Sequence, residues 1–202
     1  MARKGMLTKI NDHFFPDNQD IDQAYVYLRG PITIETCSEV IETILAINVP
    51  ETDVDEDGNE FDVDKPDVIN LLITSVGGDM NAAFALIAVM KGSTVPIRTI
   101  VVGEASSAAF CIFMAGDQRV ITPYASLMSH SFSTSVEGHY HDLKNAMIEM
   151  NSYNSKMIEL YHELTGLDRK IIKNKFLSHT DAYIPHEDAI KYNMADLLSD
   201  LK

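Results

Sequence analysis

The sequence contains few cysteines, few basic residues and no long apolar run. Its two cysteines, Cys37 and Cys111, are not in a C-x-x-C spacing, so neither a disulfide framework nor a metal ribbon is indicated. The 16 Lys and Arg against 30 Asp and Glu give a net charge of −14, which argues against a nucleic-acid partner, because phosphate binding needs clustered Lys and Arg.

The longest apolar stretches, about 82–90 and 108–115, are too short to span a bilayer. The basic residues near the N-terminus are followed by polar residues and not by the apolar segment of a signal peptide. We therefore expect a cytoplasmic protein without a membrane partner.

The remaining composition is that of a globular domain, with 202 residues, 46% of them apolar and 23% charged. We expect a flexible N-terminal segment at 1–23 and one domain at 24–202. Residues 51–66 are rich in Asp and Glu and lie between Pro50 and Pro66. Like charges repel and resist packing, so this stretch is predicted to be an acidic surface insert.

Apolar runs of strand length alternate with stripes at helical spacing along the domain. Strands are expected at 24–28, 68–73, 97–102, 119–121, 126–129 and 195–198, and helices at 38–48, 81–91, 107–115, 141–165, 168–177 and 186–192. This alternation predicts an α/β fold built from βαβ units on a mostly parallel sheet.

Two strand-to-helix turns, 75–79 and 103–108, place backbone N–H groups at helix starts. Paired, such groups can form an oxyanion hole, although a Gly-Gly turn by itself is more often only a tight turn. Ser107 at a helix start is most often a cap, and it becomes a nucleophile only where a base reaches its hydroxyl. His130 ends an apolar run, where a lone histidine is more often structural.

Four segments in order resemble the Clp protease proteolytic subunit (ClpP) family, from about 68 to 201. Residues 75–78, Ser-Val-Gly-Gly, are similar to the family's Ser-Pro-Gly-Gly turn, and residues 103–110 resemble its Gly-x-Ala-Ala-Ser-Met-Gly-Ala-Phe nucleophile segment. Residues 128–132 resemble the family's Met-Ile-His-Gln-Pro, and residues 181–196 resemble the C-terminal segment that begins with the family's catalytic aspartate.

The resemblance implies a ClpP/crotonase-like fold of repeated βαβ units with a long, protruding helix-strand handle, about 131–178. It implies an ATP-independent serine endopeptidase that needs no cofactor, in which Ser107 is the nucleophile, His130 the general base and Asp181 the residue that orients the base. The oxyanion donors that it implies are the backbone N–H groups of Gly78 and Ala108.

The partners implied by the resemblance are unfolded polypeptide substrates, further copies of this chain in a heptamer or double heptamer, and an AAA+ unfoldase. His179 and Thr180 stand where the family usually carries an acid–arginine pair that helps two rings stack, so one ring and two rings both stay open. Val76, Glu104 and Ala109 also depart from the family pattern, but none removes a triad group.

Two other functions are compatible with parts of this pattern. A catalytically silent subunit of the same fold would explain the changes near Ser107. A crotonase-type acyl-CoA enzyme would use paired backbone amides to hold an enolate, but it leaves the serine, histidine and aspartate matches unexplained.

The acidic insert contains a candidate calcium site. Residues 53–59 match the D-x-D-x-D-G start of an EF-hand loop, with an aspartate in the twelfth position. The ligands would be Asp53, Asp55, Asp57, Asn59 and Asp64. Since two prolines bracket the segment, no helices frame it, and a solvated acidic loop is the more common meaning of such a charge run.

Overall fold

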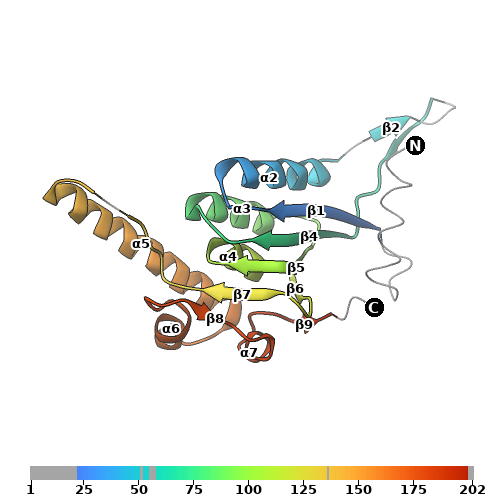
Figure 1. The fold of residues 1–202 in the computed structure, drawn as a ribbon. Coiled ribbons are helices and arrows are strands. Elements are labelled where there is room, and N and C mark those ends of the chain that lie inside the picture. The colour runs from blue at the N-terminus through green and yellow to red at the C-terminus, as the bar shows by residue number, and fades with distance from the viewer. Residues whose placement is uncertain (1–21, 51, 55–57, 136, 200–202) are drawn as a thin grey trace.

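A computed structural model describes residues 22–50, 52–54, 58–135 and 137–199. A seven-stranded sheet forms the centre of these residues, with helices packed against it (Figure 1). The elements are β1 (Gln23–Arg29), α2 (Ile34–Asn48), β2 (Thr52–Val54), β3 (Glu60–Asp62), β4 (Val68–Ser75), α3 (Met80–Gly92), β5 (Ile97–Ser106), α4 (Ala108–Met114), β6 (Gln118–Ile121), β7 (Ser126–Ser129), α5 (Tyr140–Thr165), α6 (Arg169–Ile171), the π-helix η1 (Ile172–Phe176), β8 (Ala182–Tyr183), α7 (His186–Lys191) and β9 (Leu197–Leu198).

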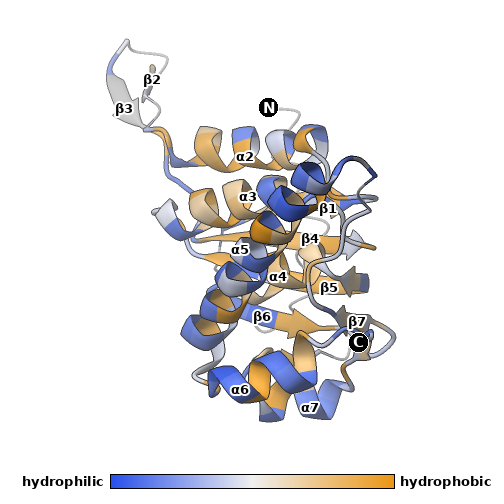
Figure 2. Ribbon diagram, turned by 90° about the vertical axis from the view of Figure 1, so that its left-hand side faces the viewer, coloured by the Kyte–Doolittle hydropathy of each residue, from blue (hydrophilic) through white to orange (hydrophobic). Residues whose placement is uncertain are grey.

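The sheet order is β1-β4-β5-β6-β9, with all neighbouring pairs parallel. The first four strands follow chain order, and right-handed crossovers in such a series place every connecting helix on the same face. Helices α2, α3 and α4 accordingly lie side by side over one face (Figure 2). The expected α/β fold with a mostly parallel sheet is confirmed.

Strand β5 pairs with two different strands along its length. Arg98 to Val101 pair with β6, whereas Glu104 to Ser106 pair with β7. Strand β7 then pairs with β8, and this is the sheet's antiparallel pair. The sheet therefore forks beyond Val101, and its second branch carries the residues after β7 and before β8.

The core lies between β4, β5 and the helices on their common face. Strand β4 is buried along nearly its whole length, as expected for a central parallel strand covered on both faces. Every residue of α4 is buried, including Phe110 and Phe113. A helix that is apolar all round belongs inside a protein, so α4 is held by packing on every side.

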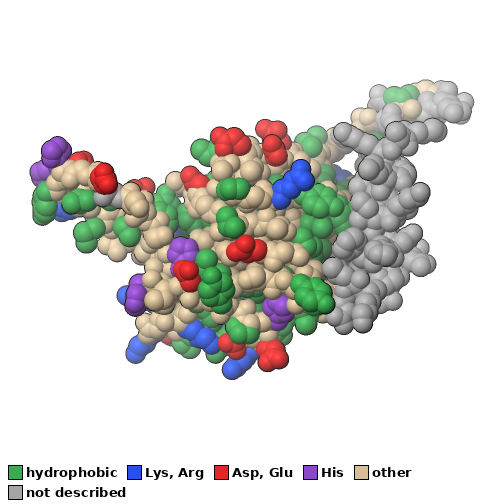
Figure 3. All heavy atoms as spheres, in the orientation of Figure 1, with side chains coloured by type: hydrophobic (Ala, Val, Ile, Leu, Met, Phe, Trp, Pro, Cys, Tyr) green, Lys and Arg blue, Asp and Glu red, His purple; other side chains and the backbone are tan. Residues whose placement is uncertain are grey.

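Helix α5 projects away from the sheet (Figure 1) and is the long helix of the expected handle. Its buried residues, from Tyr153 onward, lie in the C-terminal half that packs on the body. The N-terminal half exposes Tyr140, Leu143, Met147 and Ile148, and Figure 3 shows it standing clear of the body. The sequence predicted this helix to within one residue.

The helix expected at 168–177 is present as α6 followed by η1, although the π-helical form of its second part was not predicted. Two further local features were also not predicted. Strands β2 and β3 form a two-stranded antiparallel sheet within the acidic insert, and β8 follows Asp181 directly. These elements are only two to five residues long, too short for hydrophobic periodicity to reveal.

The predicted calcium loop is only partly covered, because Asp55 and Asp57 lie outside the described residues. Within the described ranges, no three His, Cys, Asp or Glu side chains gather as a metal site would require. The calcium loop stays a prediction. The flexible N-terminal segment 1–23 also stays a prediction, because residues 1–21 lie outside the described residues. Its last residue, Gln23, is the first residue of β1. No described helix has the length and apolar character needed to cross a membrane.

Candidate active site

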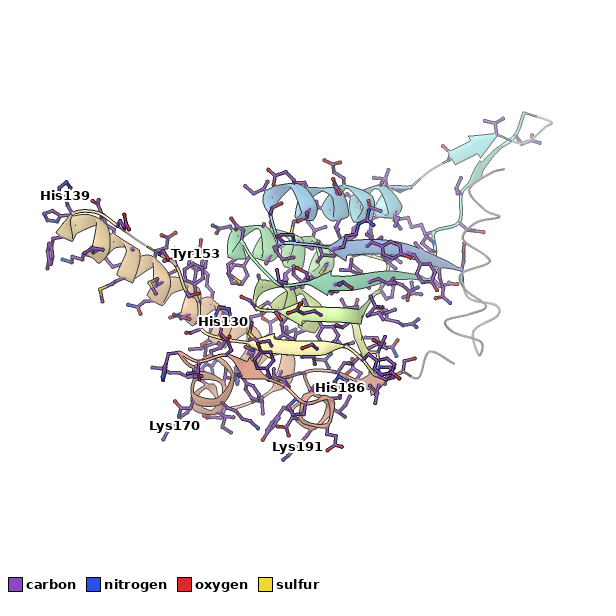
Figure 4. The ribbon with its side chains drawn as sticks, in the orientation of Figure 1. His130, His139, Tyr153, Lys170, His186 and Lys191 are labelled. Carbon is purple, nitrogen blue, oxygen red and sulfur yellow. The ribbon has the colours of Figure 1, made fainter. Side chains whose placement is uncertain are left out.

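Four strand ends meet at one edge of the sheet. The parallel strands β4, β5 and β7 all end there, and the antiparallel strand β8 begins there. Gly78 follows β4, Ser107 follows β5, His130 follows β7 and Asp181 precedes β8. The fold therefore brings to one edge residues that are up to 103 positions apart in the sequence, and Figure 4 shows His130 at this end of β7.

The backbone of Ser107 is held in an unusual conformation. Its φ of 56° and ψ of −121° lie where side-chain-bearing residues are rare, and such strain costs on the order of 1–3 kcal/mol. The Ser107 N–H donates to Met128 O at 2.9 Å, and Ser107 O accepts from Phe110 N at 3.0 Å. A strained serine on a sharp strand-to-helix turn is a recurring way to present a nucleophile.

Two glycines allow the neighbouring turn to lie against Ser107. Gly77 has φ of 91°, and a Cβ there would be 2.5 Å from Ser106 O and 2.7 Å from the Cβ of Ser107. Gly78, with φ of 149°, would place a Cβ 2.3 Å from Ile32 O. No other residue type fits either position without displacing backbone, which explains the Gly-Gly pair.

The backbone N–H groups predicted to be oxyanion donors are not used by these contacts. Ile32 N–H donates to Gly77 O and Asp79 N–H donates to Ile32 O, both at 2.9 Å, so the bridge uses the residues that flank Gly78. Ala108 is the first residue of α4, where N–H groups have no acceptor within the helix. Among the described residues, no backbone acceptor outside regular helices and strands is found for either N–H group.

The β7–β8 ladder ends next to His130 and Asp181. Met128 pairs with Tyr183 and Ser129 with Ala182, so His130 directly follows and Asp181 directly precedes the last paired residues of two adjacent strands. Ser131 N–H donates to Ser178 O at 3.0 Å and holds the turn before Asp181 against the chain after His130.

The three residues lie at neighbouring strand ends, but their side chains are not hydrogen-bonded to one another. Ser107 and His130 are half-buried and Asp181 is exposed, and within the described ranges no hydrogen bond links any two of the three side chains. Hydrogen bonds between catalytic groups are often long in ligand-free sites and shorten when substrate binds. The fold brings the three residues to one edge of the sheet without a hydrogen bond between their side chains.

Other histidines are tied elsewhere. His162 Nδ1 lies 2.7 Å from Leu167 O, and His186 Nε2 lies 2.7 Å from Ala125 O at the opposite end of β7. Figure 4 shows His139 at the far tip of α5. His179 is exposed in the turn before Asp181 and is the one other described histidine at this edge.

Contacts beside the site fix two segments that carry its residues. The Phe132 ring stacks on Tyr153 at 4.4 Å, and Phe132 N–H donates to Asn154 Oδ1 at 2.8 Å. These contacts fix the chain after His130 on α5. The Glu104 carboxylate accepts a 2.6 Å hydrogen bond from the Ser106 hydroxyl, so the charge before the nucleophile has a local partner.

Comparison with known proteins identifies the family. The Clp protease family model matches residues 18–200, and the chain belongs to that family. An ATP-dependent Clp protease proteolytic subunit of Deinococcus radiodurans is 29% identical over 135 residues, 65% of each chain. Subunit 1 of Chlamydia muridarum is 24% identical over 200 residues, 97% of this chain and 95% of that one. Subunit 1 of Chlamydia trachomatis is 23% identical over the same length.

The family assignment confirms the resemblance that the sequence motifs indicated. It supports a ClpP-type peptidase at the level of the family. The relatives are distant, so the roles of individual residues depend on the geometry at the sheet edge.

Proposed function

We propose that this chain is the serine endopeptidase core of a Clp-type protease, with Ser107 as nucleophile. His130 takes the proton from the Ser107 hydroxyl as that oxygen attacks the scissile carbonyl, and later returns it to the leaving amine. Asp181 orients the imidazole and stabilises its charged form. The N–H groups of Gly78 and Ala108 stabilise the oxyanion. The acyl-enzyme is then hydrolysed by water.

The observation that carries this proposal is the backbone of Ser107 at the meeting of four strand ends. A serine that served only as a helix cap would adopt an extended conformation and accept a hydrogen bond from the helix. Ser107 instead has positive φ and makes no side-chain capping bond. Its hydroxyl remains available for chemistry.

The substrates in this proposal are unfolded chains, cleaved inside a cytoplasmic homo-oligomeric chamber to which an AAA+ unfoldase delivers them. The name of the relatives, ATP-dependent Clp protease proteolytic subunit, supports an ATPase partner. The triad residues lie on segments that contact the projecting helix α5, so we expect ring assembly to complete the alignment of their side chains. Native mass measurement tests the heptamer, and a monomer that cleaves peptides at full rate would contradict the need for assembly.

Labelling with a fluorophosphonate probe tests the nucleophile. We expect the wild-type chain to be modified at Ser107, and Ser107→Ala to lose labelling and peptide hydrolysis while keeping its thermal stability, because only one hydroxyl is removed. Ser106→Ala is the matched control, since this buried neighbour binds Glu104 and should leave labelling intact. An unlabelled wild-type assembly would favour the silent subunit, and binding of acyl-CoA would favour the crotonase-type enzyme.

Two histidine variants test the base. His130→Ala should reduce the rate of peptide hydrolysis by at least about 10²-fold, in the range expected for removal of a general base. His179→Ala changes the other described histidine of the same edge and should retain activity. A loss confined to His179→Ala would assign the base to that residue instead.

A further inference from the structure

A chain of buried polar side chains lies directly behind the candidate base. Ser129 is 1% exposed, and its hydroxyl donates to Phe176 O at 2.8 Å. The Ser129 Oγ is also 2.6 Å from the hydroxyl of Tyr161, which is fully buried. Cys111 of α4 is also fully buried and belongs to the same core cluster as Tyr161.

The direction of these hydrogen bonds follows from the Phe176 carbonyl group at which they end. A carbonyl oxygen only accepts, so Ser129 donates to Phe176 and accepts from Tyr161. Burial raises the pKa of Cys111 to about 12 and raises the pKa of Tyr161 well above its usual value. Both groups are therefore neutral at physiological pH, and the chain consists of directional hydrogen bonds, which fix relative position.

Three residues of this cluster belong to segments that carry a proposed catalytic group. Cys111 lies one turn into α4, and its N–H donates to Ser107 O at 3.3 Å. Ser129 immediately precedes His130. Phe176 ends η1, from which the chain enters the turn that leads to Asp181.

Tyr161 connects these segments to α5. Its ring contacts Phe110 of α4 edge-on, with 6.1 Å between centroids. Its hydroxyl bonds the Ser129 hydroxyl and so ties α5 to the end of β7. A loss of this hydroxyl would leave Ser129 bonded to Phe176 O but no longer tied to α5, whose Tyr161 ring packs against the helix that begins after Ser107.

We propose that Tyr161 and Ser129 are positioning residues that hold the segments bearing Ser107, His130 and Asp181 in the relative placement needed for proton transfer. This inference rests on the proposed peptidase function. Neither residue touches the reacting atoms. Because a displacement of about 1 Å at a reacting centre can cost about 10²-fold in rate, small shifts of these segments are sufficient to slow the reaction.

Tyr161→Phe and Ser129→Ala in the assembled full-length protein test the proposal. We expect kcat to fall between about 10- and 100-fold, with KM within about twofold, because substrate binding does not use these groups. Fluorophosphonate labelling at Ser107 should slow by a similar factor. The double variant should be little worse than either single variant, because both interrupt the same chain.

Thr99→Val is the matched control. Thr99 is fully buried, and its hydroxyl donates to Phe113 O at 2.7 Å, near the end of α4 that is remote from Ser107. The Thr99→Val variant should lose thermal stability to the same degree as Tyr161→Phe while retaining the wild-type kcat.

Wild-type kcat and labelling rate in both variants, with only a loss of stability, would overturn the positioning role. If Tyr161→Phe does not fold, Ser129→Ala decides by the same criterion. A wild-type assembly that neither labels nor hydrolyses peptide would instead remove the proposed function, so the two failures are distinguishable.

Discussion

At the residue scale, the conformation of Ser107 depends on the absence of a side chain at Gly77. The Gly77 backbone lies so close to Ser106 O and the Ser107 Cβ that a methyl group cannot be accommodated without movement. The strained serine and the glycine are separate in sequence but form one structural unit. The family's Gly-Gly motif thus has a steric reason that is visible in this chain.

We predict that Gly77→Ala displaces Ser107 and abolishes labelling by a fluorophosphonate. We expect the clash to lower the unfolding free energy, measured by urea denaturation, by about 1–3 kcal/mol. Gly30→Ala is the control, because Gly30 also has positive φ, 78°, but has open space where a Cβ would go. It should cost only about 1–2 kcal/mol of backbone strain and leave labelling unchanged. Equal labelling in the two variants would contradict the steric argument.

At the element scale, helix α3 begins directly after the Gly-Gly turn and fixes where that turn ends. The Asp79 carboxylate accepts from Asn81 N–H at 2.7 Å and from Ala82 N–H at 3.0 Å. These bonds satisfy N–H groups that the helix itself leaves free.

Asp79→Ala should lower the unfolding free energy by about 1 kcal/mol, the usual cost of losing an N-cap. Asp79→Asn keeps the side-chain acceptor and should remain within a few tenths of a kcal/mol of wild type. Urea denaturation of both variants makes the comparison. If the two lose equal stability, the carboxylate charge and not the capping bond is the source of the effect.

At the scale of the whole molecule, an ion pair joins the C-terminal segment to the sheet. Arg119 in β6 donates from Nη2 to Asp196 Oδ1 at 2.6 Å, and its Nη1 donates to Asn193 O at 2.8 Å. Burial by itself would raise the pKa of Asp196, but the hydrogen bonds and positive charge of Arg119 outweigh it and lower the pKa below 3.8. Asn193, whose φ of 54° is left-handed, turns the chain toward this contact.

A carboxylate whose pKa is lowered by folding stabilises the protein above its unfolded pKa. That contribution is lost as the pH falls through the lower, folded value. We therefore expect Asp196→Asn to be less stable than wild type at pH 7 and to approach wild type as the pH falls below about 3.8. Glu163→Gln, which removes an exposed pair with Lys91, should differ little from wild type throughout. Urea midpoints measured from pH 7 to 3 test this, and a pH-independent difference for Asp196→Asn would exclude the ionic contribution.

The sequence by itself determined the elements whose signals are local and repeated. Residues 68–73 read as a buried strand because they are continuously apolar, and α5 was predicted because its apolar residues recur at helical spacing. The motif resemblance also located Ser107, His130 and Asp181, and it indicated the family that the comparison confirmed.

Only the tertiary structure decided the conformation of Ser107, the pairing of β7 with β8 and the hydroxyl chain behind His130. Ser129 and Phe176 are 47 residues apart, and no window of sequence contains both. Hydrophobic periodicity records which face of an element is buried, whereas these contacts depend on which elements meet once the core has packed. The motifs therefore proposed which residues form the candidate site, and the fold set how their segments are arranged.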